Sequence, residues 1–229
     1  TEAVGDASAA AVWTRQVLDA TGQATAVIDA RGNEAFTYVR DLRGRVVAQT
    51  SVDAGAAWAV ADGYDRAVQS WDARGYAVTR GYDLADRPTT VHVAGGDGAT
   101  AMDAMVEAYR YGDQAADRSA AVAANTVGRL VEVRDGAGVV AVSAYDPRGA
   151  VRVQGRRLRV AVDEAPDWRG AEAVESEVLT TAARTDALGR EVWTALVDGT
   201  VRASTYARGG ALASVQVTDR KSTRLNSSH

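Results

Sequence analysis

Apolar and polar residues alternate along much of the chain, which is the pattern of strands that bury one face. In the segment VRVQ, from Val151 to Gln154, the valines fall on one side and the polar residues on the other. The same period of two continues through RLRVAV, residues 157–162. Because side chains of a strand point alternately to its two faces, this pattern predicts half-buried strands in an antiparallel sheet.

A short phrase, Asp followed by two residues and Gly, returns between the alternating segments. An Asp at the first position of a turn accepts hydrogen bonds from backbone N–H groups nearby, and a Gly at the fourth adopts the left-handed conformation. Each phrase therefore predicts the tip of a β-hairpin. The phrase starts at Asp19, Asp29, Asp41, Asp72, Asp135, Asp146 and Asp186, with a variant at Asp83.

The spacing of the phrases supports a regular series of hairpins. Starts at 19, 29 and 41, then 72 and 83, then 135 and 146 lie 10, 12, 11 and 11 residues apart, which is typical of short strands joined by turns. Left-handed backbone is expected at Gly75, Gly149 and Gly189, with a smaller need for glycine at Gly98. The pattern is incomplete where Asp86 replaces the fourth-position Gly.

Several runs resemble Rhs, or YD-repeat, sequence, whose pattern is roughly Tyr-Asp, two residues, then Gly-Arg and a strand. The runs are YVRDLRGRVV, WDARGYAVTRGYDLADRPTTVHV, VRDGAGVVAVSAYDPRGAV and RTDALGREVWTALVDGTVRASTY. AYRYGD (108–113), NTVGRLVEVRDGAGVV (125–140) and APDW (165–168) are similar to the large Rhs-type toxins, of the Tc toxin B/C kind. Tyr is replaced before Asp at Leu18, Ile28, Arg40 and Arg134. The resemblance covers most of residues 10–217.

The resemblance implies a fold and a function. Repeats of this family wind consecutive antiparallel hairpins into a spiralling β-sheet shell, which encloses a toxic C-terminal polypeptide. Residues 1–218 are then an all-β structural segment of such a shell, incomplete at both ends. The implied partners are the rest of its own shell, the enclosed toxin and other components of a toxin complex, and the implied location is secreted or exported.

The last residues, 219–229, read DRKSTRLNSSH, which is the translation of a widely used sequencing-library adapter. Lys221 is the only lysine of the chain. We therefore interpret this tail as non-native and exclude it from fold reasoning. The tail holds three of the 26 basic and one of the 30 acidic residues, so residues 1–218 carry a net charge of −6.

Composition narrows the classes of function. A mildly acidic, mixed-sign surface gives no basic footprint for nucleic acid, and no apolar run has the roughly 18 residues that a membrane helix needs. The chain has no cysteine and only one Phe, while Ala and Val dominate, which favours thin sheet layers. Two stretches interrupt the hairpins: an Ala-rich segment at 113–124, predicted as a short helix capped by Asp113 or Asp117, and a loop at 164–173.

Candidate chemistry is sparse. His92 is the only histidine before the tail, and alternation explains its place in a strand, so no catalytic, cofactor-binding or metal-binding residue is assigned and the chain is predicted not to be an enzyme. Asp146-Pro147 is interpreted as a turn. The aromatic residues at 58, 71 and 193 are expected to pack across strands, although they also allow an alternative function, an extracellular adhesion or carbohydrate-binding protein. A hydrolase with a carboxylate pair is a third, weaker alternative.

Overall fold

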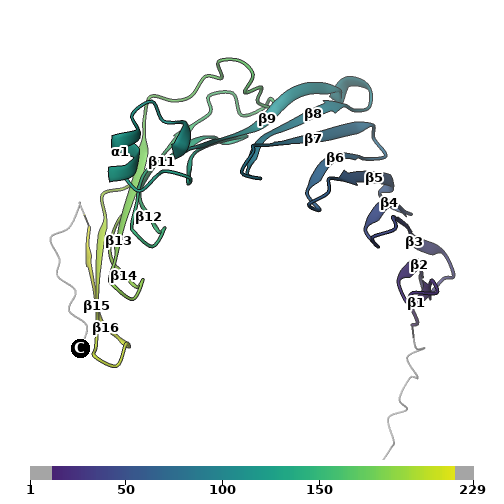
Figure 1. Ribbon diagram of the computed structural model, residues 1–229, viewed down its shortest axis with the longest axis horizontal. Coiled ribbons are helices and arrows are strands. Elements are labelled where there is room, and N and C mark those ends of the chain that lie inside the picture. The colour runs from purple at the N-terminus through teal and green to yellow at the C-terminus, as the bar shows by residue number, and fades with distance from the viewer. Residues whose placement is uncertain (1–11, 220–229) are drawn as a thin grey trace, which may run out of the picture. The chain divides into compact units, whose positions relative to one another are not determined.

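The computed structural model describes residues 12–219 and is an all-β fold (Figure 1). Its strands follow one another in the sheet in chain order, from β1 to β16. The strands are β1 (Arg15–Leu18), β2 (Ala24–Ile28), β3 (Glu34–Arg40), β4 (Val46–Ser51), β5 (Gly55–Ala61), β6 (Ala67–Trp71), β7 (Tyr76–Tyr82), β8 (Pro88–Gly95), β9 (Met102–Tyr111), β10 (Leu130–Asp135), β11 (Gly138–Tyr145), β12 (Val151–Leu158), β13 (Leu179–Thr185), β14 (Glu191–Ala195), β15 (Val201–Tyr206) and β16 (Leu212–Thr218). The prediction of consecutive antiparallel hairpins is confirmed.

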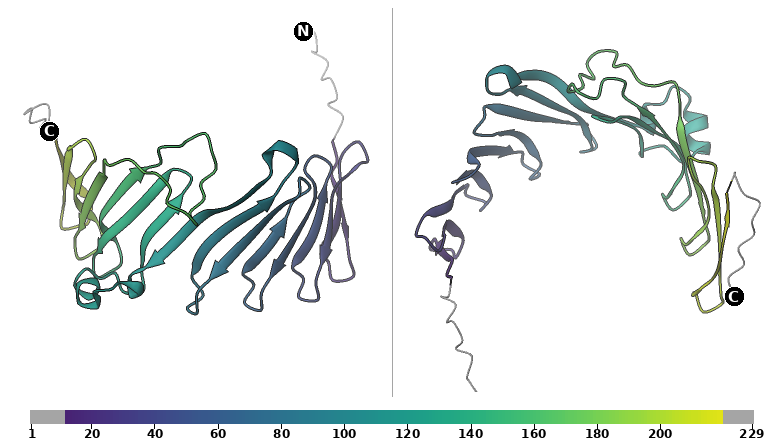
Figure 2. Two further views of the ribbon diagram at one scale, coloured as in Figure 1. Left: turned by 90° about the horizontal axis from the view of Figure 1, so that it is seen from above. Right: turned by 180° about the vertical axis from the view of Figure 1, so that it is seen from behind.

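Contacts divide the described chain into two compact units. The first holds residues 12–80 and 93–103, and the second holds 81–92 and 104–219. Within each unit the strands lie side by side with hairpin turns at both sheet edges (Figure 2). Neighbouring strands pair antiparallel from β1 to β7 in the first unit and from β9 to β16 in the second.

The helix is shorter than the sequence predicts. Helix α1 spans Arg118–Ala123, and the Asp117 carboxylate caps it by accepting the Ala120 N–H at 3.0 Å. Asp113 instead lies in a 3-10 turn, η2 (Gly112–Gln114), where its carboxylate accepts bonds from Arg87. Ala115 then takes extended backbone and separates the two segments. Asp117 is therefore the cap, because the Asp113 carboxylate is already occupied. A further 3-10 turn, η1, spans Gly98–Thr100.

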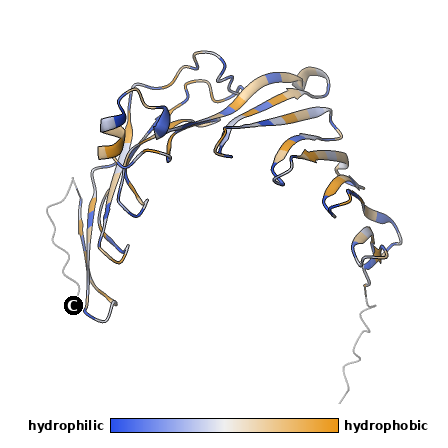
Figure 3. Ribbon diagram, in the orientation of Figure 1, coloured by the Kyte–Doolittle hydropathy of each residue, from blue (hydrophilic) through white to orange (hydrophobic). Residues whose placement is uncertain are grey.

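The apolar interior is thin, as the composition predicts. Hydropathy alternates along the strands of each unit (Figure 3). Among residues 12–219, no side chain is less than 2% exposed. The buried apolar residues in that range are Ala26, Ala104, Tyr111, Ala121, Val139, Tyr145 and Trp168. Each unit is thus mainly a single sheet, and all of these buried residues except Ala26 belong to the second unit.

The loop at 159–178 docks on the sheet of the second unit. Trp168 N–H donates to Met105 O at 2.9 Å, and the Asp167 carboxylate accepts Met105 N–H at 3.1 Å. Both backbone groups of Met105 are therefore satisfied by the loop, where β9 extends beyond β10. Buried Arg159 holds the loop base, since its guanidinium donates to Gly136 O and Glu164 O. The predicted loop at 164–173 is confirmed.

Candidate functional site, a ladder of turns along one sheet edge

The predicted hairpin tips form with the expected hydrogen bonds, except at Asp135, where a two-residue turn joins Asp135 directly to its strand partner Gly138. In the first, Gly22 N–H donates to Asp19 O at 3.1 Å and Asp19 N–H to Gln23 O at 2.9 Å. The Asp19 carboxylate accepts the N–H groups of Thr21 and Gln23. Gly22 has φ +82°, the left-handed conformation that glycine tolerates best. The same backbone pair of bonds closes the turns that start at residues 29, 41, 72, 146 and 186.

The left-handed positions agree with the sequence, with one correction. Gly75, Gly149 and Gly189 have φ of +81°, +97° and +81°, as predicted. Gly98 also has a positive φ, +55°, so the smaller need for glycine expected there was wrong. It is the first residue of the 3-10 turn η1, Gly98–Thr100.

Three turns of the same type escaped the sequence pattern. They start at Asp62, Leu196 and Ala207. The fourth residue of the first is Asp65, which takes the left-handed φ of +64°, as Asp86 does at +63° in the variant turn. Asp tolerates this conformation better than most residues. The pattern missed the turn at Asp62 because the fourth residue is not Gly. The signal that could have identified it is the Asp at the first position together with Arg66 directly after the turn.

An arginine directly after the turn completes the motif in four copies. In each, the arginine Nε donates to the second carboxylate oxygen of the turn Asp, at 2.7 to 2.8 Å. These hydrogen bonds lower the pKa of the turn carboxyls below the usual value. The pairs are Asp41–Arg45, Asp62–Arg66, Asp83–Arg87 and Asp186–Arg190.

The turns that follow odd-numbered strands share one edge in each unit, because successive strands run in opposite directions. We call this edge the turn edge. In the first unit it carries turns 19–22, 41–44 and 62–65, and in the second it carries 83–86, 146–149, 186–189 and 207–210. Every second strand except β9 thus presents one turn, and we call this row of turns the ladder.

Arginines join successive rungs of the ladder. Arg45 Nη1 donates to Asp62 O at 2.9 Å and to the Asp65 carboxylate at 2.7 Å. Arg87 donates both terminal nitrogens to Asp113, at 2.9 and 2.8 Å, and the pair lowers the pKa of Asp113 to about 2. Each guanidinium therefore ties its own turn to the next element on the same edge.

Tyrosine and arginine form a repeated interlock in the second unit. Arg87 lies over the ring of Tyr111, with 4.0 Å from Cζ to the ring centroid, and the Tyr111 hydroxyl donates to Pro88 O at 2.9 Å. Two further copies have the same form. Arg129 lies over Tyr145, whose hydroxyl donates to Leu130 O, and Arg190 lies over Tyr206, whose hydroxyl donates to Glu191 O.

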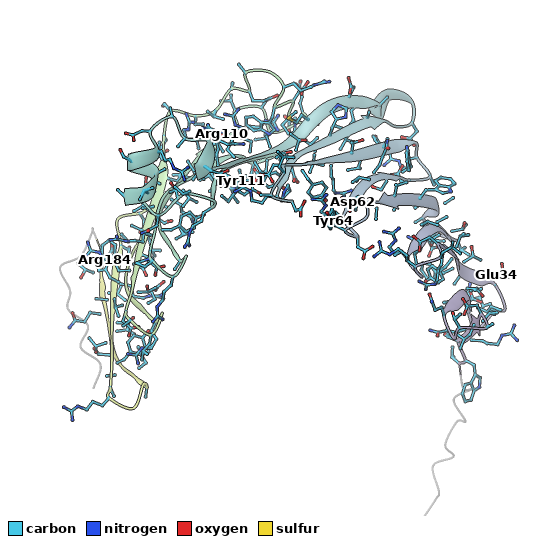
Figure 4. All side chains as sticks on the ribbon, viewed as in Figure 1. Glu34, Asp62, Tyr64, Arg110, Tyr111 and Arg184 are labelled. Atoms are coloured by element: carbon cyan, nitrogen blue, oxygen red, sulfur yellow. The ribbon has the colours of Figure 1, made fainter. Side chains whose placement is uncertain are left out.

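The interlock pairs each arginine with a tyrosine that comes later in the chain. In each copy the arginine precedes one strand, and the tyrosine ends the next strand, so antiparallel pairing brings the two together. The aromatic face attracts the guanidinium, and the phenol satisfies the carbonyl next to that arginine. Burial raises the pKa of Tyr111 and Tyr145. Figure 4 shows Tyr111 beside Arg110, its neighbour on the strand.

Other candidate residues occupy structural positions. Asp146 lies in a turn, as predicted, and its second carboxylate oxygen accepts the Thr185 hydroxyl at 2.7 Å. Trp58 and Trp71 face each other across β5 and β6, as expected of packing pairs. His92 lies in β8. Among residues 12–219 no group of three or more His, Cys, Asp or Glu is placed to hold a metal ion, and no helix in that range has the length and apolarity to cross a membrane.

Comparison with solved structures identifies proteins of similar fold. No family model and no curated protein sequence matches the chain. The crystal structure of TcdB2-TccC3 matches with a TM-score of 0.81 at 23% identity, covering 93% of this chain and 11% of that chain. The Tc holotoxin pore of Photorhabdus luminescens matches with the same TM-score and identity, covering 92% of this chain and 10% of that one.

These matches confirm the all-β fold of consecutive antiparallel strands. The chain spans about a tenth of the length of the chains that it matches. The same similarity holds for TcdB2-TccC3 without its hypervariable C-terminal region, again with a TM-score of 0.81. The matched part therefore lies outside that region, among the strands of the larger protein.

Proposed function

We propose that the chain is a structural segment of a toxin-encapsulating Rhs, or YD-repeat, shell, which sequesters a C-terminal toxic polypeptide. The observation that carries the proposal is the similarity of nearly the whole described sheet to TcdB2-TccC3. Residues 1–218 are the structural part, and the chain is not an enzyme. Its partners are the rest of its own shell, the enclosed polypeptide and other components of a toxin complex, and its location is outside the producing cell.

The ladder suits a wall. Arg45 and Arg87 tie their turns to the next element on the same edge, which helps the sheet to extend without a second layer to support it. Pairing every strand with its neighbours leaves few free edges. Alternating strands also present two independent faces, one for an interior and one for solvent. A wall that is one sheet thick needs few residues for each unit of area that it covers.

The test is protease protection in a chimaera. Residues 15–218 replace the matching strands of TcdB2-TccC3, and cleavage of its C-terminal segment is followed over time. We expect the segment to resist protease as in the parent protein. A control chimaera with Arg87→Gln and Arg190→Gln should lose protection, because two rungs are cut. Equal cleavage of the segment in the first chimaera and in a free peptide control would contradict enclosure.

The enzymatic alternative has its own test. Residues 1–218 expressed inside a cell are expected to leave growth unchanged, because the toxic activity belongs to sequence elsewhere. Growth arrest that a single carboxylate substitution abolishes would restore the hydrolase alternative. Growth arrest that survives every such substitution would instead point to a non-catalytic effect of the sheet.

An adhesion or carbohydrate-binding function remains the second candidate, and one observation favours it. Trp58 is 48% exposed and pairs with Trp71, while Ala48 and Ala77 flank the two indoles in the same row of the sheet. Small flanking residues leave the indole faces open, as in a platform on which sugar rings stack. Glycan binding that Trp58→Ala abolishes and Trp13→Ala preserves would favour adhesion.

A further inference from the structure

Three arginines line one open groove on the turn edge of the second unit. The groove lies between turns 146–149 and 186–189 and measures about 370 Å³, and its walls include Arg148, Arg152 and Arg184. All three side chains are exposed. Arg184 belongs to β13, where Figure 4 marks it. The carboxylates of Asp146 and Asp186 also line the groove, so its lining holds three positive and two negative side chains.

The two carboxylates of the groove are occupied by other donors. Asp146 accepts the N–H groups of Arg148 and Ala150 on one oxygen, and the Thr185 hydroxyl on the other. Asp186 accepts the Leu188 N–H and the Arg190 N–H and Nε–H groups. Neither carboxylate accepts a bond from the guanidinium of an arginine that lines the groove.

The three guanidinium groups consequently lack an anionic partner. Within residues 12–219, those of Arg148 and Arg152 make no ion pair, and that of Arg184 lies over the Trp193 ring at 4.9 Å. Arg148 reaches across to the next turn, since its Nη1 lies 3.6 Å from the place that a Cβ on Gly189 would take. Its charged group thus lies at the groove rather than over its own turn.

One turn of the ladder lacks the arginine that pairs with the turn carboxylate, and this explains why the arginines around it have no anionic partner. The residue after turn 146–149 is Ala150, where the four complete copies have the arginine that pairs with the turn carboxylate. The Thr185 hydroxyl takes that bond instead and brings no charge. Arginine is therefore absent from the neutralising position and present at three positions around it.

We infer that this groove is a binding site for a doubly charged tetrahedral oxyanion, a phosphate or sulfate group. Guanidinium groups are always protonated and present several N–H donors in a fixed plane, which suits two-point contact with such oxygens. Three of them match the charge and the number of acceptors of a dianion better than those of a monovalent carboxylate. The site belongs to this chain's own turns and does not depend on the proposed shell.

The experiment is calorimetric titration of the full chain with inorganic phosphate at low ionic strength and pH 7.5. We expect one saturable site per chain with a Kd on the order of millimolar, because the arginines are exposed and water competes. Sulfate should bind alike and acetate more weakly. Tighter binding of glucose 6-phosphate than of free phosphate would identify a phosphate ester as the natural source, and equal binding would identify the free ion.

Matched variants localise the site. Arg152→Gln should weaken phosphate binding about fivefold, because one charged donor is lost. Arg208→Gln removes the same charge from an exposed turn residue of the same edge and should leave binding unchanged. Arg152→Lys keeps the charge and serves if the Gln variant misfolds, with an expected weakening smaller than that of Gln. Absence of saturable binding by the unmodified chain, or equal effects of the substitutions at 152 and 208, would overturn the inference.

Discussion

At the residue scale, single side chains set the conformation of the turns. A turn Asp accepts up to two backbone N–H groups with one oxygen and an arginine with the other, as Asp186 does. The fourth residue must adopt a left-handed backbone, which disfavours residues with a Cβ. At Gly149 a Cβ would also lie 2.2 Å from Arg129 Nη1. Gly149 therefore serves both the backbone conformation of its turn and the packing of the Arg129 guanidinium.

The first prediction concerns Gly189. Gly189→Val should lower the free energy of unfolding by more than about 1 kcal/mol, because valine is strained at a φ of +81°, whereas a Cβ there would meet Arg148 Nη1 only at an ordinary contact distance of 3.6 Å. The measurement is urea unfolding at sub-micromolar concentration, followed by tryptophan fluorescence. Gly209→Val is the control, since Gly209 lacks a positive φ and has no atom within 4 Å of its Cβ position. Equal costs at both positions would contradict the argument.

Residue patterns predicted most turns but not all of them. Asp-x-x-Gly identifies a turn because both end residues have a special role, so Asp146 and Gly149 were readable directly. The turn that ends at Asp65 was not predicted, because Asp is also common at positions that do not have a left-handed backbone. Leu196 and Ala207 begin turns without a side-chain acceptor at the first position, so the Asp-x-x-Gly pattern does not identify them, although backbone bonds of the same type close both turns.

At the element scale, the ladder couples each turn to the next, and acid should uncouple it. The pKa of Asp83 is lowered by its hydrogen bond with Arg87, and that of Asp113 falls to about 2. A lowered pKa in the folded state stabilises the fold above the unfolded value near 4, and the contribution disappears as pH falls through the folded value.

The second prediction follows from that sign. The unfolding midpoint should be nearly constant from pH 7 to about 4 and fall between about 4 and 2. Arg87→Gln should lower the midpoint at neutral pH and make the acid slope shallower, because Asp83 and Asp113 then titrate nearer to their unfolded values. Arg208→Gln should leave the slope unchanged. An unaltered slope in Arg87→Gln would show that the ladder pairs do not control acid stability.

The third prediction concerns the Tyr–Arg interlock. Tyr206→Phe keeps the stacking under Arg190 and removes only the hydroxyl bond to Glu191 O. It should cost about 1 kcal/mol, the usual contribution of one hydrogen bond. Tyr64→Phe is the control, because Tyr64 is 76% exposed at a turn tip. Combining Tyr206→Phe with Arg190→Gln should give less than the sum of the two costs, and strict additivity would argue against a shared interlock.

The fourth prediction concerns the docked loop. Arg159 is 4% exposed, lies 3.3 Å from the Glu172 carboxylate, and donates to two backbone carbonyls at the loop base. Arg159→Met removes these donors and leaves the carboxylate unpaired, which should cost about 3 kcal/mol. Hydrogen exchange at Trp168 N–H should accelerate more than at strand amides. Unchanged exchange at Trp168 would mean that the loop stays docked without Arg159.

The sequence could not reveal this docking. The sequence predicts a loop that includes the APDW segment, but it does not predict where the loop binds. Its attachment to Met105 depends on the overhang of β9 beyond β10, a length difference that arises only when the strands are paired. The shorter helix has a similar cause, because the distant residue Arg87 engages Asp113. Contacts with residues distant in the sequence therefore determine the docking of the loop and the length of the helix, which local sequence patterns do not predict.

At the scale of the whole molecule, each unit is a sheet with little interior. The described residues bury few apolar side chains, while large apolar residues such as Phe36 and Trp58 remain 40% and 48% exposed. Stability must therefore come from strand pairing and from the ladder rather than from a thick core. The composition, in which Ala and Val dominate and aromatic residues are few, predicted this thin organisation.

The last prediction concerns association. Among residues 12–219, β1 and β16 each have a strand neighbour on one side only, and both are exposed along their length. Such edges offer unpaired backbone groups to another chain. The isolated chain should therefore associate as its concentration rises, visible in sedimentation as species larger than a monomer.

Because the strand number is even, a β1 edge added beside β16 continues both the antiparallel order and the turn edge, so open-ended assemblies are expected rather than closed dimers. Lysine substitutions at Val215 and Val217, which are 38% and 52% exposed, should suppress association by charging that edge strand. A concentration-independent monomer with cooperative unfolding would show instead that the edges are covered and that the sheet is complete as it stands.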